Sequence, residues 1–118
     1  MFTANCHCNR IRLDTENSPK TITHCNCSIC NRLGALWAYY SADKVSIHNH
    51  AETGQYRWGD KNLTFHFCQH CSCTTHYTTT KENGSRLVAI NTRMAELSVT
   101  KDIPIRYFDG ADTWQFID

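Results

Sequence analysis

The chain has 118 residues, of which 41% are hydrophobic, and its 12 Lys and Arg against 11 Asp and Glu give a formal net charge of +1. This hydrophobic content with so little net charge excludes a disordered chain, and the scattered charges argue against nucleic-acid binding, which needs a basic stripe. The length fits one domain covering residues 1–118.

Short segments rich in aromatic and β-branched residues follow one another between turn residues, as in a mostly β domain. The expected strands are Asn9–Thr15, Thr21–His24, Ala35–Ser41, Lys44–His48, Gly54–Trp58, Leu63–Phe67, Thr74–Thr80, Arg86–Asn91 and Ile103–Phe108. Ile11 and Leu13 are expected on the buried face of the first strand, and Asn83-Gly84 favours a hairpin turn. Little helix is expected: a turn or two within Thr92–Ser98 and after Cys27, since neither stretch has a full 3.6-residue apolar face.

Cysteine stands out in this composition, with eight residues. The N-terminus lacks the basic segment and apolar stretch of a signal peptide, and no apolar run is long enough to span a bilayer. We therefore expect a cytoplasmic protein without membrane contact, in a reducing compartment where dense cysteine indicates metal binding. Four disulfides or eight free buried thiols are the alternatives; the missing signal and the two C-x-C pairs argue against disulfides.

The cysteines form three clusters, two of which combine into a closed zinc site. The clusters are Cys6-His7-Cys8, Cys25-Asn26-Cys27-Ser28-Ile29-Cys30 and Cys68-Gln69-His70-Cys71-Ser72-Cys73. A C-x-C pair on an extended strand places both sulfurs on one face, and a C-x-x-C turn presents two thiolates to one ion. Zinc takes four such ligands in a tetrahedron. The first and third clusters therefore predict a structural zinc site on Cys6, Cys8, Cys68 and Cys71.

The middle cluster predicts a second zinc site with an incomplete ligand set. Cys25, Cys27 and Cys30 can reach one ion, and catalytic zinc sites keep three protein ligands with an exchangeable fourth position. Cys73 is left over, as a candidate fourth ligand, as a thiol beside a ligand, or as a bystander. The other candidates for the fourth position are His7, His24 and His70. We thus expect two zinc ions per chain, and the second site is the one that can be partly occupied.

The order of the cysteine motifs is specific. It reads C-x-C at Cys6–Cys8, C-x-C-x-x-C-x-x-x-G at Cys25–Gly34 and F-C-x-x-C at Phe67–Cys71. Weaker similarities are Tyr56-Arg57-Trp58-Gly59, Ala89-Ile90-Asn91-Thr92-Arg93 and Phe108-Asp109-Gly110. Together these stretches resemble the glutathione-dependent formaldehyde-activating enzyme family, which includes centromere protein V, over nearly the whole chain.

The resemblance implies a small Mss4-like β-sheet fold. It implies a catalytic zinc on Cys25, Cys27 and Cys30 and a structural zinc on the four cysteines already combined. The activity implied is that of a carbon–sulfur lyase, which joins glutathione and formaldehyde to S-hydroxymethylglutathione or cleaves that adduct. The partners implied are a thiol such as glutathione and a small aldehyde.

Three positions depart from the family pattern. Ser72 stands where glycine is usual, which suggests an altered turn because glycine tolerates positive φ. Cys73 stands where a small hydroxyl residue is usual. Asn31 replaces a basic residue, although Arg32 keeps a positive charge nearby.

The mechanism expected is nucleophilic attack by a thiolate. A substrate thiol enters the open position, loses its proton and attacks the aldehyde carbon. Three thiolates and Zn²⁺ sum to −1, which disfavours water activation and favours thiol chemistry, with Arg32 and backbone N–H groups offsetting the charge.

The main alternative is a zinc-stabilised, non-catalytic interaction module whose second site is closed by Cys73 or a histidine; another is thiol-dependent detoxification of a different electrophile. Core packing is favoured over a substrate pocket for Trp37, Tyr39 and Trp58.

Overall fold

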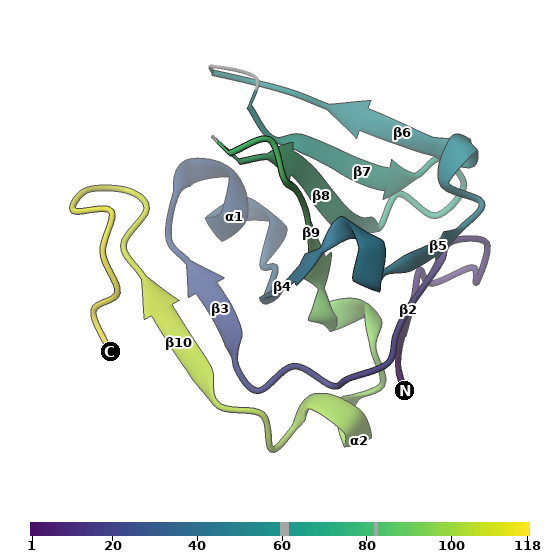
Figure 1. Ribbon diagram of the computed structural model, residues 1–118, viewed down its shortest axis with the longest axis horizontal. Helices are drawn as coiled ribbons and strands as arrows, with labels where there is room; N and C mark the ends of the chain where they lie inside the picture. The colour runs from purple at the N-terminus through teal and green to yellow at the C-terminus, as the bar shows by residue number, and fades with distance from the viewer. Residues whose placement is uncertain (60–61, 82) are drawn as a thin grey trace.

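Two β-sheets form the framework of the protein, seen here in a computed structural model that describes residues 1–59, 62–81 and 83–118 (Figure 1). The smaller sheet has the strand order β1 (Phe2–Asn5), β2 (Arg12–Thr15) and β5 (Ser46–His48). The larger has the order β10 (Ile105–Phe108), β3 (Ile22–Cys25), β4 (Trp37–Ser41), β9 (Arg86–Asn91), β8 (Thr74–Thr80), β7 (Thr64–Cys68) and β6 (Thr53–Tyr56). Neighbouring strands are antiparallel except β10 and β3, which are parallel. The predicted mostly β class is confirmed, and each predicted strand overlaps an observed one.

Helical segments are short, as the sequence predicts. They are α1 (Ser28–Leu33), α2 (Leu97–Thr100) and the 3₁₀ turns η1 (Ala42–Lys44), η2 (His50–Glu52) and η3 (Thr92–Met94). The helix expected after Cys27 is α1, whereas the one expected over Thr92–Ser98 is divided between η3 and α2. Among the described residues, none of these helices combines the length and the apolar character needed to cross a membrane.

The N-terminal segment differs from its prediction in two ways. Strand β1 is absent from the predicted strands, although Phe2 and Ala4 are fully buried; two apolar residues in a four-residue strand are too weak a pattern, and burial against β2 decides their conformation. The strand predicted from Asn9 begins only at Arg12, because the residues before it form a turn in which Asn9 has a φ of +67°. Cys6 and its C-x-C partner therefore lie in a turn and not on a strand.

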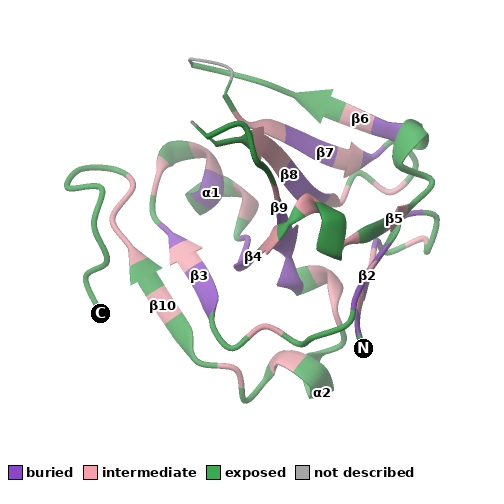
Figure 2. Ribbon diagram, viewed as in Figure 1, coloured by how far each residue is buried: buried purple, intermediate pink, exposed green. Residues whose placement is uncertain are grey.

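The larger sheet separates two hydrophobic clusters, because alternate residues of a strand point to opposite faces. Val88 and Ile90 of β9 pack with Leu13 of the smaller sheet and with Ile11 just before β2, and both Ile11 and Leu13 are fully buried as predicted. Ala89, between them, belongs to the cluster on the other face. Figure 2 shows the buried segments of β7, β8 and β9 running through the middle of the molecule. Each hydrophobic cluster also contains one of the cysteine groups.

The predicted turn at Asn83-Gly84 joins β8 and β9. These strands pair in antiparallel register as far as Thr80 and Arg86. Gly84 has a φ of +86°, which a side chain would disfavour. The hairpin turn is thus where the sequence places it.

Candidate metal centres

Four cysteines from two segments far apart in the sequence lie together beside the smaller sheet. Cys6 and Cys8 come from the turn after β1, Cys68 is the last residue of β7, and Cys71 lies in the turn that follows it. Their four sulfurs all lie within 4.8 Å of one another. The turns bring backbone N–H groups toward the sulfurs: Ile11 N donates to Cys6 Sγ at 3.3 Å, as His70 N does to Cys68 Sγ at 3.4 Å.

This group of four sulfurs fits a zinc ion. The sulfurs of Cys6 and Cys8 are 3.7 Å apart, and those of Cys8 and Cys68 are 3.5 Å apart. A tetrahedron with ~2.3 Å zinc–sulfur bonds has edges of about 3.8 Å. None of the eight cysteines, all in the described part of the chain, forms a disulfide. The thiols are therefore available as ligands.

The turn after Cys71 contains two of the three positions that depart from the family pattern. Ser72 has a φ of +68°, so the turn keeps the conformation that glycine would favour and the serine bears its strain. Ser72 N donates to Cys68 O at 2.9 Å, which closes the turn. Cys73 packs against the first hydrophobic cluster and stands outside every group of three or more sulfurs found in the described residues. It lies with Cys6 and His7 along one hollow, away from the middle cysteine cluster.

The middle cluster forms where β3 ends and α1 begins. Cys25 is the last residue of β3, Cys27 is the N-cap of α1, and Cys30 lies in the first turn of that helix. Cys27 Sγ accepts a hydrogen bond from Cys30 N at 3.4 Å, so the sulfur that caps the helix also belongs to the cysteine group. Gly34 ends the helix with a φ of +66°, and its N–H reaches Cys30 O at 3.0 Å. The C-x-C-x-x-C-x-x-x-G spacing is therefore a strand end followed by a capped helical turn.

The sulfurs of Cys25, Cys27 and Cys30 lie within 4.8 Å of one another. Within residues 1–59, 62–81 and 83–118, no fourth His, Cys, Asp or Glu side chain joins this group. Cys25 and Cys30 are buried and Cys27 is partly exposed. The group thus offers three thiols to an ion from the protein side, and Cys27 marks its side toward solvent.

The buried side chain of Trp37 contacts the middle cluster through a hydrogen bond to Cys30. Its Nε1–H donates to Cys30 Sγ at 3.3 Å, and the residue is 1% exposed. The indole packs edge-on against Tyr77 at 4.8 Å between ring centroids and lies 6.1 Å from Phe65. This N–H withdraws charge from one sulfur. Core packing is therefore confirmed for Trp37, whereas the same prediction is wrong for Tyr39 and Trp58, whose side chains are exposed at 45% and 44%.

The C-terminal segment follows β10, which lies beside β3 at the left of Figure 1, and its turn contacts the same cluster. A Cβ atom on Gly110 would lie 2.6 Å from Cys25 Sγ. Asn26, between two of the cysteines, donates from Nδ2 to Asp109 Oδ1 at 3.0 Å and accepts at Oδ1 from Ala111 N at 3.0 Å. The sequence shows the Asp-Gly turn but not this contact, which joins residues more than 80 positions apart.

Hydrogen bonds and burial give the thiols within each cluster different pKa values. The Cys30 thiol, together with the backbone N–H groups of Cys27 and Gly110, lowers the pKa of Cys25 to about 5. The same contact with Cys25, followed by burial, raises the pKa of Cys30. In the other cluster, burial raises the pKa of Cys6 to about 11. Several thiolates so close together repel one another, and a divalent cation removes that repulsion.

The remaining candidate residues lie elsewhere. His24 neighbours Cys25 on β3 and so points to the other face, where its ring lies 5.4 Å from that of Tyr107. His7 and His70 are exposed, and neither belongs to a group of possible ligands among the described residues. Arg32 donates to Ser28 O at 2.9 Å, a carbonyl of its own helix.

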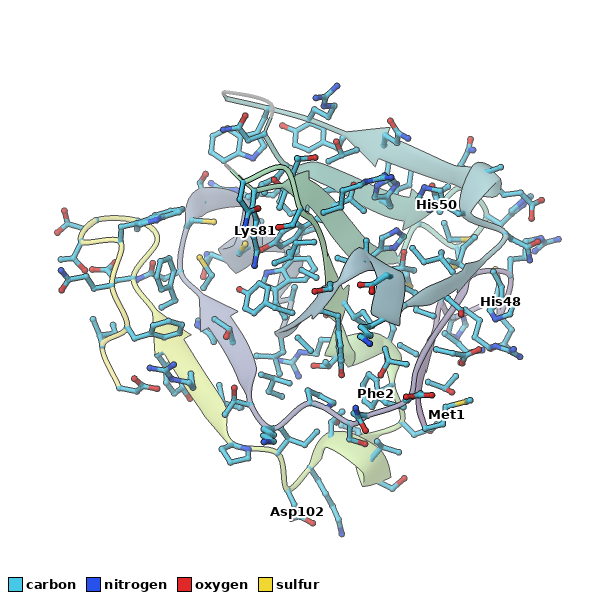
Figure 3. The ribbon with its side chains drawn as sticks, in the orientation of Figure 1. Met1, Phe2, His48, His50, Lys81 and Asp102 are labelled. Atoms are coloured by element: carbon cyan, nitrogen blue, oxygen red, sulfur yellow. The ribbon has the colours of Figure 1, made fainter. Side chains whose placement is uncertain are left out.

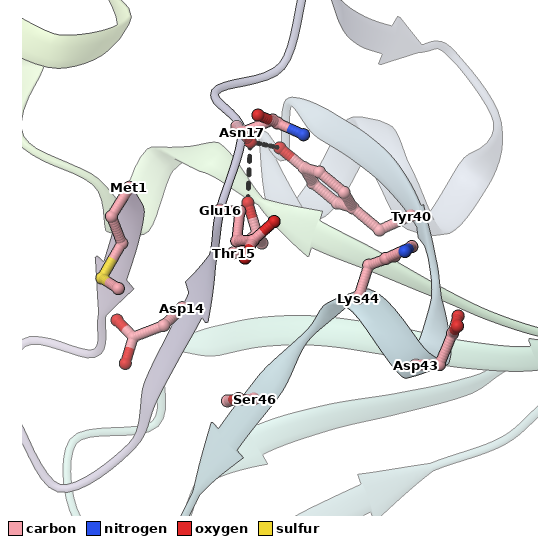
Figure 4. A pocket seen from close by; sticks show the side chains of 9 residues that line it. All are labelled: Met1, Asp14, Thr15, Glu16, Asn17, Tyr40, Asp43, Lys44 and Ser46. Carbon is pink, nitrogen blue, oxygen red and sulfur yellow. Dashed lines mark hydrogen bonds between the residues drawn. The ribbon is translucent and has the colours of Figure 1, made fainter.

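A partly open cavity lies at the end of the smaller sheet. It has a volume of about 440 Å³, and carboxylates dominate its charged lining (Figure 4). Tyr40 Oη and Thr15 Oγ1 both donate to Asn17 O there, at 2.9 and 2.7 Å. The residues that line it are Met1, Asp14, Thr15, Glu16, Asn17, Tyr40, Asp43, Lys44 and Ser46. It contains no cysteine, so it does not extend either thiol cluster.

These features define a small β domain with a group of four cysteines and a group of three, each of which could hold a zinc ion. The model of the glutathione-dependent formaldehyde-activating enzyme family matches residues 1–106, and the chain belongs to this family. A crystal structure of a Rhodobacter sphaeroides protein has a similar fold, with a TM-score of 0.69 and 19% identity over 87% of this chain and 98% of that chain. No curated protein matches the chain.

Proposed function

We propose that the protein is a zinc-dependent carbon–sulfur lyase that forms and cleaves the adduct of a thiol such as glutathione with a small aldehyde such as formaldehyde. Zinc ions would bind at two places, one on Cys6, Cys8, Cys68 and Cys71 and one on Cys25, Cys27 and Cys30. Membership of the family supports glutathione and formaldehyde as the substrate class. A cytoplasmic location would supply the glutathione.

The observation that carries this proposal is the difference between the two cysteine groups. The first has four sulfurs, enough to complete a zinc tetrahedron, and the second has three. A zinc ion there would supply a position at which a substrate thiol ionises at neutral pH. A structural module needs no such position.

The protein's own groups prepare this position. Cys25 and Cys30 are held by the core, and Cys27 is exposed enough for a substrate sulfur to approach on its side. Trp37 Nε1–H and the N–H of Gly110 take up part of the negative charge of the thiolates. The arriving thiolate then forms the sulfur–carbon bond at the aldehyde carbon, and the proton lost by the thiol goes to the carbonyl oxygen. Atoms and electrons balance without an oxidant.

Residues beyond the family match belong to the same domain in this proposal. The match ends at residue 106, whereas β10 continues to Phe108 beside β3. The following turn is bonded to Asn26 within the middle cluster. The whole chain would therefore act as one zinc domain.

The test is the rate of exchange between glutathione, ¹³C-formaldehyde and their adduct, measured by exchange NMR with zinc-loaded protein. Catalytic protein accelerates the exchange above the spontaneous rate, and Cys27→Ser removes that acceleration. Cys73→Ser is the matched control, since it makes the same chemical change at a cysteine outside both groups, and it keeps the acceleration. Acceleration that survives Cys27→Ser would disprove the proposal.

A non-catalytic interaction module is the second candidate, and one surface favours it. Five large apolar side chains of β10 and the C-terminal segment are between 40% and 69% exposed. They are Ile105, Tyr107, Trp114, Phe116 and Ile117. The module is the better description if glutathione leaves the ¹¹³Cd NMR spectrum of the cadmium-loaded protein unchanged and the protein does not accelerate the exchange of glutathione with formaldehyde.

A further inference from the structure

Three histidines outside both cysteine groups converge between the two sheets. His66 of β7 and His76 of β8 face each other across the strands and are 2% and 0% exposed. His50, in the η2 turn and labelled in Figure 3, is exposed, and its ring centroid lies 4.8 Å from that of His66 and 5.5 Å from that of His76. One ring nitrogen from each of the three lies within 4.8 Å of the others.

A bulge in the sheet produces this convergence. The register of β7 with β8 shifts between His66 and Phe67, so that Thr75 is left without a strand partner. Such bulges redirect side chains and are frequent beside functional sites. Here the result is that His66 and His76 stack, with 4.4 Å between ring centroids and 6° between ring planes.

The hydrogen bonds fix which nitrogen of His66 carries the proton. The hydroxyl of Thr53 donates its single proton to His50 O at 2.8 Å. At His66 Nδ1, 3.2 Å away, the same hydroxyl must then accept. His66 therefore carries its proton on Nδ1, and its Nε2 has a lone pair, which accepts from Thr78 Oγ1 at 3.0 Å.

The same reasoning applies to His76. The hydroxyl of Thr75 lies 2.8 Å from His76 Nδ1 and 3.4 Å from His66 O, and in the site proposed below it accepts from the former and donates to the latter. His76 Nε2 is thus left with a lone pair, and it has no hydrogen-bond partner among the described residues although it is completely buried. A buried polar atom without a partner costs about 1–3 kcal/mol, so its presence points to a ligand that the nitrogen can bind.

We propose that His50, His66 and His76 form a third metal site, which binds a divalent transition-metal ion of the kind that prefers imidazole ligands, such as Zn²⁺, Co²⁺, Ni²⁺ or Cu²⁺. Metal-bound histidines typically donate the other ring N–H to an oxygen, which sets the tautomer and the orientation of the ring. Thr53 and Thr75 provide those oxygens here.

Binding requires one movement, which follows from the stacking. The lone pair of an imidazole nitrogen lies in the plane of the ring, so one ion cannot lie in both parallel planes. One ring must turn, and the χ2 torsion of histidine is broad enough to allow this at small cost. His66 exchanges its bond with Thr78 for the ion, while exposed His50 can adjust freely. With three protein ligands the ion keeps further positions for water or another small ligand.

The test uses protein whose cysteine groups are already loaded with zinc, to which Co²⁺ is added. One further Co²⁺ per chain is expected by equilibrium dialysis, with visible d–d absorption and without the near-ultraviolet charge-transfer band of cobalt bound to thiolate. His50→Gln removes an exposed ligand without disturbing the core, and we expect it to weaken Co²⁺ binding by more than about 100-fold, since loss of a supporting contact alone costs 10–100-fold. His48→Gln, the same change two residues earlier at another exposed histidine, leaves binding intact.

Two results would overturn the third site. One is binding of Co²⁺ that is equal in the wild type and in His50→Gln, or that carries the thiolate charge-transfer band. The other comes from long-range ¹H–¹⁵N NMR of the histidine rings, which needs no variant. His66 and His76 are expected as Nδ1–H tautomers whose Nε2 signals shift on addition of Zn²⁺, and an Nε2–H tautomer at His76 contradicts the site.

Discussion

Gly110→Ala isolates the contact between the C-terminal turn and the second cysteine group. The added Cβ would lie 2.6 Å from Cys25 Sγ and 3.3 Å from Cys27 Cβ. Gly110 is not among the glycines with positive φ, so the backbone accepts alanine and only the contact changes. Overpacking of this kind costs about 1–3 kcal/mol. If the turn moves away instead, the two hydrogen bonds of Asn26 are lost, at about 1 kcal/mol each.

Both responses predict the same effect on metal binding. An unbound Cys25 side chain can rotate away from the new methyl group, whereas a sulfur held by zinc cannot. The second site should therefore bind zinc about 5- to 150-fold more weakly, because each 1.4 kcal/mol is a factor of ten, while the first site keeps its affinity. Competition with a chromophoric chelator resolves the two affinities. Ala111→Val adds bulk at the next, exposed residue and serves as the control. Equal affinity of Gly110→Ala and the wild type at both sites would refute the contact.

Three further predictions concern single side chains. Ser72→Gly should raise the free energy of unfolding by about 0.5–1 kcal/mol, because it relieves a φ of +68° that costs about 1–2 kcal/mol, partly offset by the greater unfolded-state freedom of glycine; a destabilised variant in chemical denaturation contradicts this. Trp37→Phe removes the N–H that reaches Cys30 Sγ and should weaken zinc binding at the second site by about tenfold or more, since a bond to a charged group contributes about 1.5–3 kcal/mol; unchanged affinity in chelator competition argues against it. Asp14→Asn should cost about 1 kcal/mol at pH 7, because Asp14 accepts from Thr3, Arg12 and His48 at 2.8, 3.1 and 2.9 Å. Burial opposes ionisation of Asp14, but these partners outweigh it and lower its pKa, so the loss is full above the unfolded-state pKa of about 3.9 and vanishes as the pH falls through the lower folded-state pKa. Denaturation curves from pH 2 to 7 measure this, and a loss that persists at pH 2 contradicts it.

The cysteines within each cluster could be predicted to share an ion because their spacing is local, whereas Cys8 and Cys68, 60 residues apart, were joined only by counting the four ligands that zinc takes. Residues two or three apart in a turn reach one ion whatever the rest of the fold does, and Gly34 marks where the helical turn after Cys30 ends. The strand conformation predicted for Cys6 and Cys8 is wrong for the same reason: a tight turn gathers two sulfurs as well as a strand does, and spacing does not distinguish them.

Contacts that depend on register and on chain closure could not be predicted. His66 and His76 meet because β7 pairs with β8 and a bulge shifts their register by one residue, and a one-residue shift changes which side chains face each other. His50 is brought over them by a 3₁₀ turn that has no clear sequence signal. Likewise, the contact of Gly110 with Cys25 exists only because β10 lies parallel to β3.

The open coordination position proposed at Cys25, Cys27 and Cys30 is tested most directly by ¹¹³Cd NMR of the cadmium-loaded protein. The chemical shift of ¹¹³Cd depends on the number of thiolate ligands, so the two cysteine groups should give separate signals, one typical of four thiolates and one of three. Addition of glutathione should move only the second signal, toward the four-thiolate position. Two signals that both indicate four thiolates before glutathione is added, and that do not move afterwards, would show that the second site is closed.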